Sequence, residues 1–126
     1  STGLSSEKEI ENFLNEFDNS NIVLNHTQLS YDIKDCNLSA LHKMKSRYNV
    51  KVSYGSHCSN HNVLYMSLCY NPSDILFYIK GNDNKKYPDD KHAIKLNDIE
   101  EIIYNLKNLK QATGTGIKQK MEIKIK

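Results

Sequence analysis

The sequence predicts an α+β domain in which three helices pack on an antiparallel sheet as two layers. Three observations lead to this fold class: helix-capping residues followed by apolar stripes, alternating apolar segments separated by turn residues, and a length of 126 residues, which suffices for one core. The expected sheet is a three-stranded meander over about 50–80 with flanking strands. The expected helices cover about 6–17, 38–48 and 97–110.

The first helix has a clear start. Ser6 and Glu9 have the spacing of a capping box, and an apolar stripe of helical period follows it. The stripe consists of Ile10, Phe13, Leu14 and Phe17. After a polar break, the short apolar stretch 22–24 and the alternating stretch 29–33 predict one or two strands that flank the meander.

The second helix is expected to begin at Asn37, which can cap it, and to end near Tyr48. Its apolar residues share one face, and its basic residues point outward. The third helix is expected to begin with the capping pair Asn97 and Glu100, and a long apolar stripe follows. That stripe consists of Ile99, Ile102, Ile103, Leu106 and Leu109.

The meander is predicted from three apolar or alternating runs at 50–54, 63–70 and 75–80. The turn between the last two is Asn-Pro-Ser-Asp at 71–74, in which proline presets φ and the polar side chains can bond the backbone. The polar segment 81–90 has too few apolar residues to join the core, and we expect a loop there.

Two parts of the chain are expected to differ in organisation. Residues 1–111 form a single α+β domain, and 112–126 form a Gly/Thr link followed by a basic tail or an edge strand. From Lys107 onward the chain has six lysines and one glutamate. Met121, Ile123 and Ile125 alternate with polar residues, which is the pattern of a lysine-guarded edge strand.

Composition narrows the function classes. The formal net charge of +2 is far from the strongly basic balance of a dedicated nucleic-acid-binding domain. Abundant Asn, Lys, Ile and Tyr beside a single Arg and no Trp indicate an AT-rich genome, so lysine content is weak evidence for nucleic-acid binding. No apolar run reaches the roughly 18 residues of a membrane span.

Cysteine usage bears on the compartment. Three cysteines cannot all pair within one chain, none forms a C-x-x-C motif, and no signal peptide is visible. These observations favour an intracellular location. Two matches to the N-glycosylation pattern, at Asn25 and Asn37, keep a secreted protein as the alternative.

The segment 54–63, which contains His57, Cys58 and His61, is the densest group of potential ligands. Between two predicted strands it reads as a solvated hairpin loop, because a zinc site needs a third or fourth ligand that the nearby sequence does not supply. No metal and no cofactor are therefore predicted. The sequence also lacks the motifs of common hydrolases and phosphate-binding loops.

The absence of a catalytic motif favours binding over catalysis, and we predict a protein–protein interaction module of a larger protein. The expected binding surface is a sheet face rich in tyrosine, the kind of amphipathic surface enriched at interfaces. Its residues are Tyr54, Tyr65, Tyr70 and Tyr78. Pairing of the edge strand near Met121 with a second copy would give a homodimer.

Two alternatives stay open. The helix, three-strand, helix order from Leu38 to Leu109 resembles the topology of the double-stranded-RNA-binding domain, and the tail lysines would contact phosphates. These lysines are Lys118, Lys120, Lys124 and Lys126. The second alternative is a small metal-independent ribonuclease, whose acid and base would come from His42, His57, His61 and His92.

Overall fold

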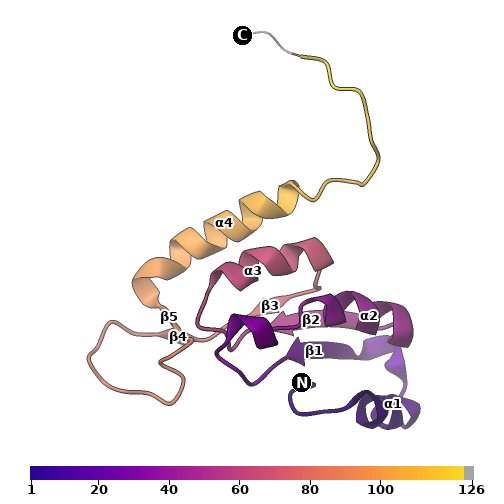
Figure 1. The fold of residues 1–126 in the computed structure, drawn as a ribbon, viewed down its shortest axis with the longest axis horizontal. Helices are drawn as coiled ribbons and strands as arrows, with labels where there is room; N and C mark the ends of the chain where they lie inside the picture. The colour runs from indigo at the N-terminus through magenta and orange to yellow at the C-terminus, as the bar shows by residue number, and fades with distance from the viewer. Residues whose placement is uncertain (124–126) are drawn as a thin grey trace.

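The computed structural model describes residues 1–123, and within that range every strand pairing is parallel (Figure 1). Three strands form one sheet in the order β1-β2-β3, and two more form a separate pair, β4-β5. Their bounds are β1 (Val23–Thr27), β2 (Lys51–Gly55), β3 (Ile75–Leu76), β4 (Ile79–Lys80) and β5 (Ile94–Lys95). The predicted antiparallel meander is therefore wrong.

Helices make the parallel order possible. Parallel neighbours need a crossover of a dozen or more residues, and α2 (Ser39–Tyr48) and α3 (Asn62–Ser67) lie within the two crossovers. The chain therefore runs β1-α2-β2-α3-β3, which is two consecutive βαβ units.

The error in the prediction comes from residues 63–70, which form α3 and a following 3₁₀ turn instead of a strand. Their burial has helical period: Val63 and Leu64 are buried, as are Ser67 and Leu68 one turn later, while Met66 is exposed. A short apolar run does not distinguish a strand from a buried helix by composition alone.

The three predicted helices are present as α1 (Glu7–Asn15), α2 and α4 (Ile99–Gln111). The capping box of Ser6 and Glu9 is confirmed, whereas the caps expected at Asn37 and Asn97 are not formed. The alternating stretch 29–33 is no strand, and a 3₁₀ turn covers Ile33–Asp35.

The two faces of the main sheet differ in chemistry. The face under α2 and α3 carries Leu24 and His26 from β1 and Val52 and Tyr54 from β2, all of them buried. The rings of His26 and Tyr54 stack with centroids 6.4 Å apart. The core continues into the helices and β5, where the most deeply buried large side chains are Leu41, Leu64 and Ile94.

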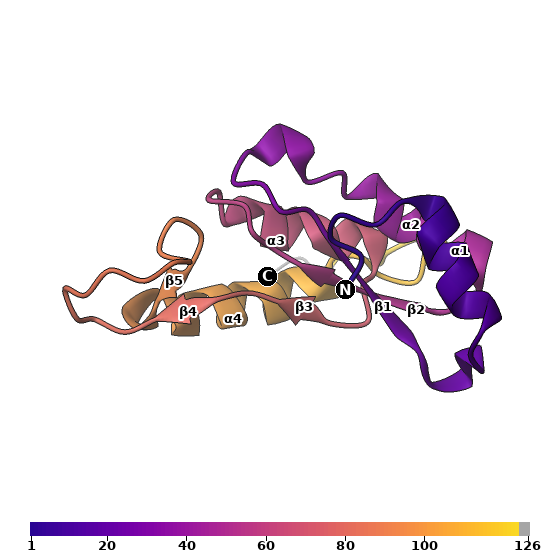
Figure 2. The same ribbon diagram turned by 90° about the horizontal axis from the view of Figure 1, so that it is seen from below.

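The opposite face carries small and polar residues: Asn25 and Thr27 from β1, and Ser53 and Gly55 from β2. The start of the chain lies against β1 (Figure 2), where the backbone N–H of Thr2 donates to the carbonyl oxygen of Asn25 at 2.9 Å. This contact partly covers a sheet face that an isolated three-stranded sheet would expose.

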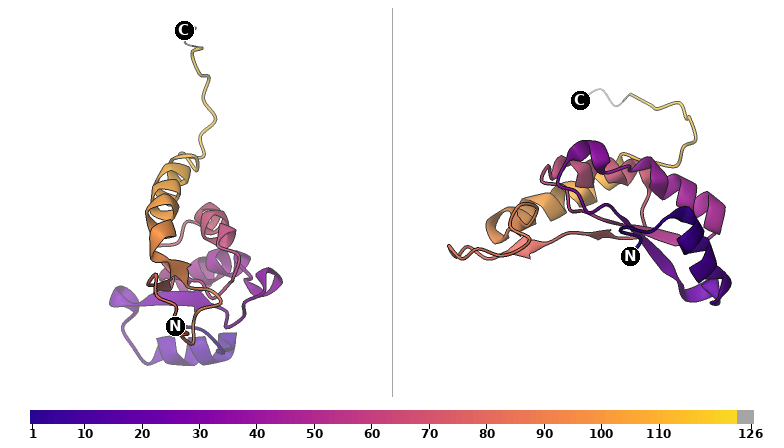
Figure 3. Two further views of the ribbon diagram at one scale, coloured as in Figure 1. Left: turned by 90° about the vertical axis from the view of Figure 1, so that its left-hand side faces the viewer. Right: turned by 60° about the horizontal axis from the view of Figure 1, so that its bottom comes forward.

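The remaining elements are attached at the periphery. Arg47 of α2 forms ion pairs with Glu7 and Glu11 of α1. The amide of Asn105 in α4 donates to the hydroxyl of Tyr65 in α3 at 3.3 Å, and α4 packs along α3 (Figure 3). Beyond α4, residues 114–123 are in neither helix nor strand and extend away from the body (Figure 1).

The packing of the Asn25 side chain against β2 requires glycine at position 55. A Cβ atom on Gly55 would lie 2.9 Å from both terminal atoms of the Asn25 side chain. We expect Gly55→Ala to lower the free energy of unfolding by about 1–3 kcal/mol because of this overpacking. Urea denaturation would measure the change. Gly81→Ala is the control, since the nearest atom there is 3.9 Å away.

A double substitution tests the cause. Asn25→Ala removes the atoms that Gly55→Ala would meet, so the two changes together should cost less than their sum. Additive effects, or equal midpoints for Gly55→Ala and Gly81→Ala, would contradict this explanation.

Candidate functional site

The carboxyl ends of the parallel strands bring together residues that are far apart in the sequence. In open α/β sheets, ligands bind outside this edge, because loops from neighbouring strands converge there. Here β1 ends at Thr27, β2 ends at Gly55 and is followed by His57, and the chain passes through Tyr78 after β3. We call the group Thr27, Tyr31, His57, His61, Tyr78 and His92 the histidine cluster.

The segment that follows β2 is held at several points. The backbone N–H of Ser56 donates to Leu76 O at 3.0 Å, and both the N–H and the hydroxyl of Ser59 donate to Tyr31 O. Ser56 and Cys58 are buried. The prediction of a solvated hairpin loop is therefore wrong, since this segment connects a strand to α3 and packs against its neighbours.

His57 contacts three members of the cluster. Its Nδ1 lies 3.0 Å from the hydroxyl oxygen of Thr27. Its ring centroid is 4.8 Å from that of His92 and 5.4 Å from that of Tyr78. These contacts place its imidazole at the centre of the cluster.

His92 is the most buried member, with 3% of its surface exposed. Tyr78 meets its ring edge-on at 4.7 Å, and Tyr31 lies at 5.6 Å. Neither ring nitrogen of His92 has a hydrogen-bond partner in the described part of the chain, and the nearest carboxylate oxygen, from Asp89, is 3.7 Å from Nε2. Its polar atoms are thus buried without the partners that such atoms usually have.

His61 and Tyr31 complete the cluster. A carbonyl oxygen only accepts, so the contact of 3.2 Å between His61 Nε2 and His92 O shows that Nε2 of His61 carries a proton. At the rim, the ammonium of Lys91 lies 5.0 Å from the ring centroid of Tyr31, within the range of a cation–π contact.

The surroundings of His92 keep it neutral. Burial lowers its pKa below 6.5, the nearby His57 and His61 lower it further, and the charge of Asp89 opposes them. Near neutral pH this imidazole therefore offers one N–H donor and one nitrogen acceptor to a ligand.

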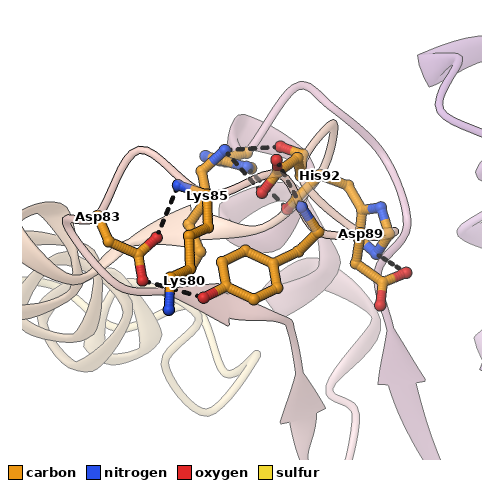
Figure 4. A network of polar contacts seen from close by, with 8 residues as sticks. Lys80, Asp83, Lys85, Asp89 and His92 are labelled. Atoms are coloured by element: carbon orange, nitrogen blue, oxygen red, sulfur yellow. Dashed lines mark hydrogen bonds and ion pairs between the residues drawn. The ribbon is translucent and has the colours of Figure 1, made fainter.

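The segment that carries His92 is organised by its own polar contacts (Figure 4). The ammonium of Lys80 donates to Asp90 O at 2.8 Å, and the hydroxyl of Tyr87 donates to Asp83 Oδ2 at 2.9 Å. The backbone N–H of His92 donates to Asp89 O at 3.2 Å. These bonds fix the turn from which His92 points back toward the cluster.

Two hollows compete as ligand sites. The larger, 660 Å³, lies on the α1–α2 side and is lined by His42 and by Arg47, whose charge Glu7 and Glu11 already pair. A smaller one of 280 Å³ adjoins the histidine cluster. It is lined by Tyr78, which belongs to the cluster, and by Asp89, which lies 3.7 Å from His92. We favour the smaller one, because Tyr78 of the cluster and Ala93, the residue next to His92, line it.

Within residues 1–123, no three His, Cys, Asp or Glu side chains are arranged to hold a metal ion. In the same range, no helix is long and apolar enough to cross a membrane.

The residues proposed from the sequence are dispersed. His57, His61 and His92 meet, whereas His42 lies apart on α2. Of the four tyrosines, Tyr54 is buried in the core, Tyr65 and Tyr70 pack against it, and Tyr78 joins the cluster.

The tail residues were expected to form a binding surface. Lys118 and Lys120 belong to the exposed stretch after α4, and Lys124 and Lys126 lie outside the described residues, as does part of the predicted edge strand. A protein partner and a homodimer formed through this strand stay predictions.

Sequence reasoning missed Thr27, Tyr31 and Asp89. No motif marks them. Thr27 and Tyr31 join the cluster because the segments that follow β1 and β2 lie at one edge of the sheet, and Asp89 lies beside His92. A prediction of residues 63–70 as a helix would have indicated two βαβ units. In such units the strands end at the same edge of the sheet, so the residues that follow them are expected to lie close together.

A model of the NeuB family matches residues 1–118. Among solved structures, the chain is similar to an N-acetylneuraminic acid (sialic acid) synthetase from Leptospira borgpetersenii serovar Hardjo-bovis in complex with citrate. The TM-score is 0.83 at 21% identity, and the similarity covers 94% of this chain and 43% of that one. At this identity it establishes the fold alone. No curated protein sequence matches the chain.

These matches overturn the functions expected from the sequence. They point to a domain with an enzymatic function, so the non-enzymatic protein-interaction module and the RNA-binding domain are wrong. The NeuB family match also replaces the small ribonuclease as the enzymatic alternative. The chain spans less than half of the similar synthetase.

The low pKa of His92 predicts a pH dependence of stability. Because the folded state holds His92 neutral, the unfolded state binds its proton first as the pH falls below 6.5, and stability is lost. We expect His92→Gln, which does not titrate, to lose less stability than the wild type between about pH 7 and pH 5. Urea midpoints measured across this range would show it, and parallel curves would contradict it.

Proposed function

Because this chain belongs to the NeuB family, we propose that it supplies the ligand-binding edge of an enzyme similar to sialic acid synthetase. The ligand would bind at the histidine cluster, at the carboxyl edge of β1, β2 and β3. The family match and the fold support an enzyme, and the position of the cluster follows the rule for ligand sites in parallel sheets.

One observation supports this location most strongly. Burying a polar group without a hydrogen-bond partner costs about 1–3 kcal/mol, and His92 buries two ring nitrogens in this way. A ligand that bonds to either nitrogen would recover part of that cost on binding. A polar ligand that reached these nitrogens would therefore stabilise the cluster.

The chemistry of the cluster suits a carboxylate. Both molecules named for the similar structure, N-acetylneuraminic acid and citrate, are carboxylic acids. Imidazole N–H groups and the ammonium of Lys91 at the rim can donate to such a group. A bound carboxylate would also favour the charged form of His92 and raise its pKa.

NMR of the histidine rings tests the proposal directly. Titration of the chain with N-acetylneuraminate, and separately with citrate, should shift the imidazole signals of His57 and His92. His42 serves as the internal control because it lies apart on α2. Shifts at His42 alone, or at none of these rings, would contradict the proposed site.

Substitutions test the same site by affinity. Loss of a hydrogen bond to a charged group costs about 1.5–3 kcal/mol, so His57→Ala and His92→Ala should each weaken carboxylate binding by about tenfold or more. His42→Ala should bind as the wild type does. Calorimetry would measure the affinities, and circular dichroism would confirm that each variant folds. Equal losses in all three variants would count against the cluster.

A further inference from the structure

Cys36 and Cys58 are buried thiols that the proposed function does not use. Cys36 is 7% exposed and Cys58 is 2% exposed, and both belong to the core cluster. All three cysteines of the chain are free thiols, and the third, Cys69, is exposed. The two buried cysteines therefore form a group apart from Cys69.

The fold brings these two cysteines together from different crossovers. Cys36 follows the 3₁₀ turn Ile33–Asp35 between β1 and α2, and Cys58 lies between β2 and α3. The two segments are joined nearby, because the carbonyl oxygen of Tyr31 accepts hydrogen bonds from the N–H of Ser59 at 3.1 Å and from its hydroxyl at 3.0 Å. Segments that are more than twenty residues apart in the chain are thus neighbours in the structure.

The side chains of the two cysteines meet. The thiol of Cys36 is in hydrogen-bond contact with the side chains of Cys58 and Tyr54. Its backbone is held, since Nε2 of His26 donates to Cys36 O at 3.1 Å and the His26 ring stacks on Tyr54. The backbone N–H of Cys58 donates to the hydroxyl of Ser56 at 3.3 Å. Both backbones are therefore fixed with the thiols side by side.

The surroundings keep the pair as thiols near neutral pH. Burial raises the pKa of Cys36, the neighbouring Cys58 thiol raises it further, and it reaches about 11. The thiolate is the form that reacts with oxidants, so the Cys36 thiol is unreactive at neutral pH while no strong oxidant is present.

We propose that Cys36 and Cys58 form a reversible disulfide when the chain is exposed to hydrogen peroxide, and that this bond locks the segment after β2 to the turn after β1. The peroxide oxidises one thiol to a sulfenic acid and releases water. The other thiol attacks that sulfur, the S–S bond forms, and a second water molecule leaves. This redox device does not depend on the proposed ligand, since neither thiol belongs to the histidine cluster.

The bond would change stability in a measurable way. It would close a loop of chain that contains α2 and β2. Such a cross-link restricts the unfolded chain more than the folded one, so the oxidised protein should unfold at a higher urea concentration than the reduced protein.

The test uses Cys69→Ala, which removes the exposed thiol and with it bridges between molecules. The folded protein is treated with hydrogen peroxide, the remaining thiols are alkylated, and peptide mass spectrometry locates the disulfide. Both thiols should be lost together, one linked pair of peptides should contain Cys36 and Cys58, and dithiothreitol should restore both thiols. Cys36→Ser and Cys58→Ser in the same background are the matched controls, and neither should form a disulfide.

Three outcomes would overturn the proposal. The first is that both thiols persist in the folded protein, or pass to sulfinic acid without a linked pair. The second is a linked pair that forms only in urea, and the third is an equal urea midpoint for the oxidised and reduced proteins. Circular dichroism checks that each variant folds. Should Cys69→Ala fail to fold, the wild-type peptide map decides, because a Cys36–Cys58 pair differs in mass from any bridge to Cys69.

Discussion

The parallel pairing of β1 with β2 is the constraint on which the rest of this structure depends. Its register aligns Val23 with Lys51 and Thr27 with Gly55, so both strands end at the same edge. A parallel pair cannot be closed by a tight turn, and the chain must cross over the sheet before β2 can form. The helix α2 fills that crossover and covers one face with apolar side chains.

The same pairing places the core residues and the residues of the candidate site in different parts of the sheet. Leu24, Val52 and Tyr54 point to the helices and form the core, while Thr27 and Gly55 stand at the carboxyl edge. Glycine at 55 permits the close approach of the Asn25 side chain. Polar groups that would be costly in the core are collected at the edge, and the two orphaned nitrogens of His92 are the clearest example. A ligand with hydrogen-bonding groups would satisfy them.

Local signals in the sequence were sufficient for the three long helices, because a capping box or a long apolar stripe depends on neighbours within a few residues. They were not sufficient for the sheet. The run 63–70 is apolar enough for a strand, and only its burial after folding, with Met66 exposed between Leu64 and Ser67, shows the helical period. That single misreading turned two βαβ units into an antiparallel meander.

The candidate site was only partly accessible to sequence reasoning for the same reason. His57 and His61 were singled out by their proximity in the chain, but their partners Thr27 and His92 lie about thirty residues away on either side. Strand topology brings them together, and topology was the part of the prediction that failed. The buried environment of His92 likewise depends on contacts that no local pattern encodes.

In the proposed function a carboxylate ligand binds at the histidine cluster, and a crystal structure of the chain grown with N-acetylneuraminate would show whether it does. We expect a carboxylate oxygen within about 2.6–3.2 Å of a ring nitrogen of His57 or His92. A ligand in the hollow near His42, or a cluster that stays empty at saturating ligand, would contradict it.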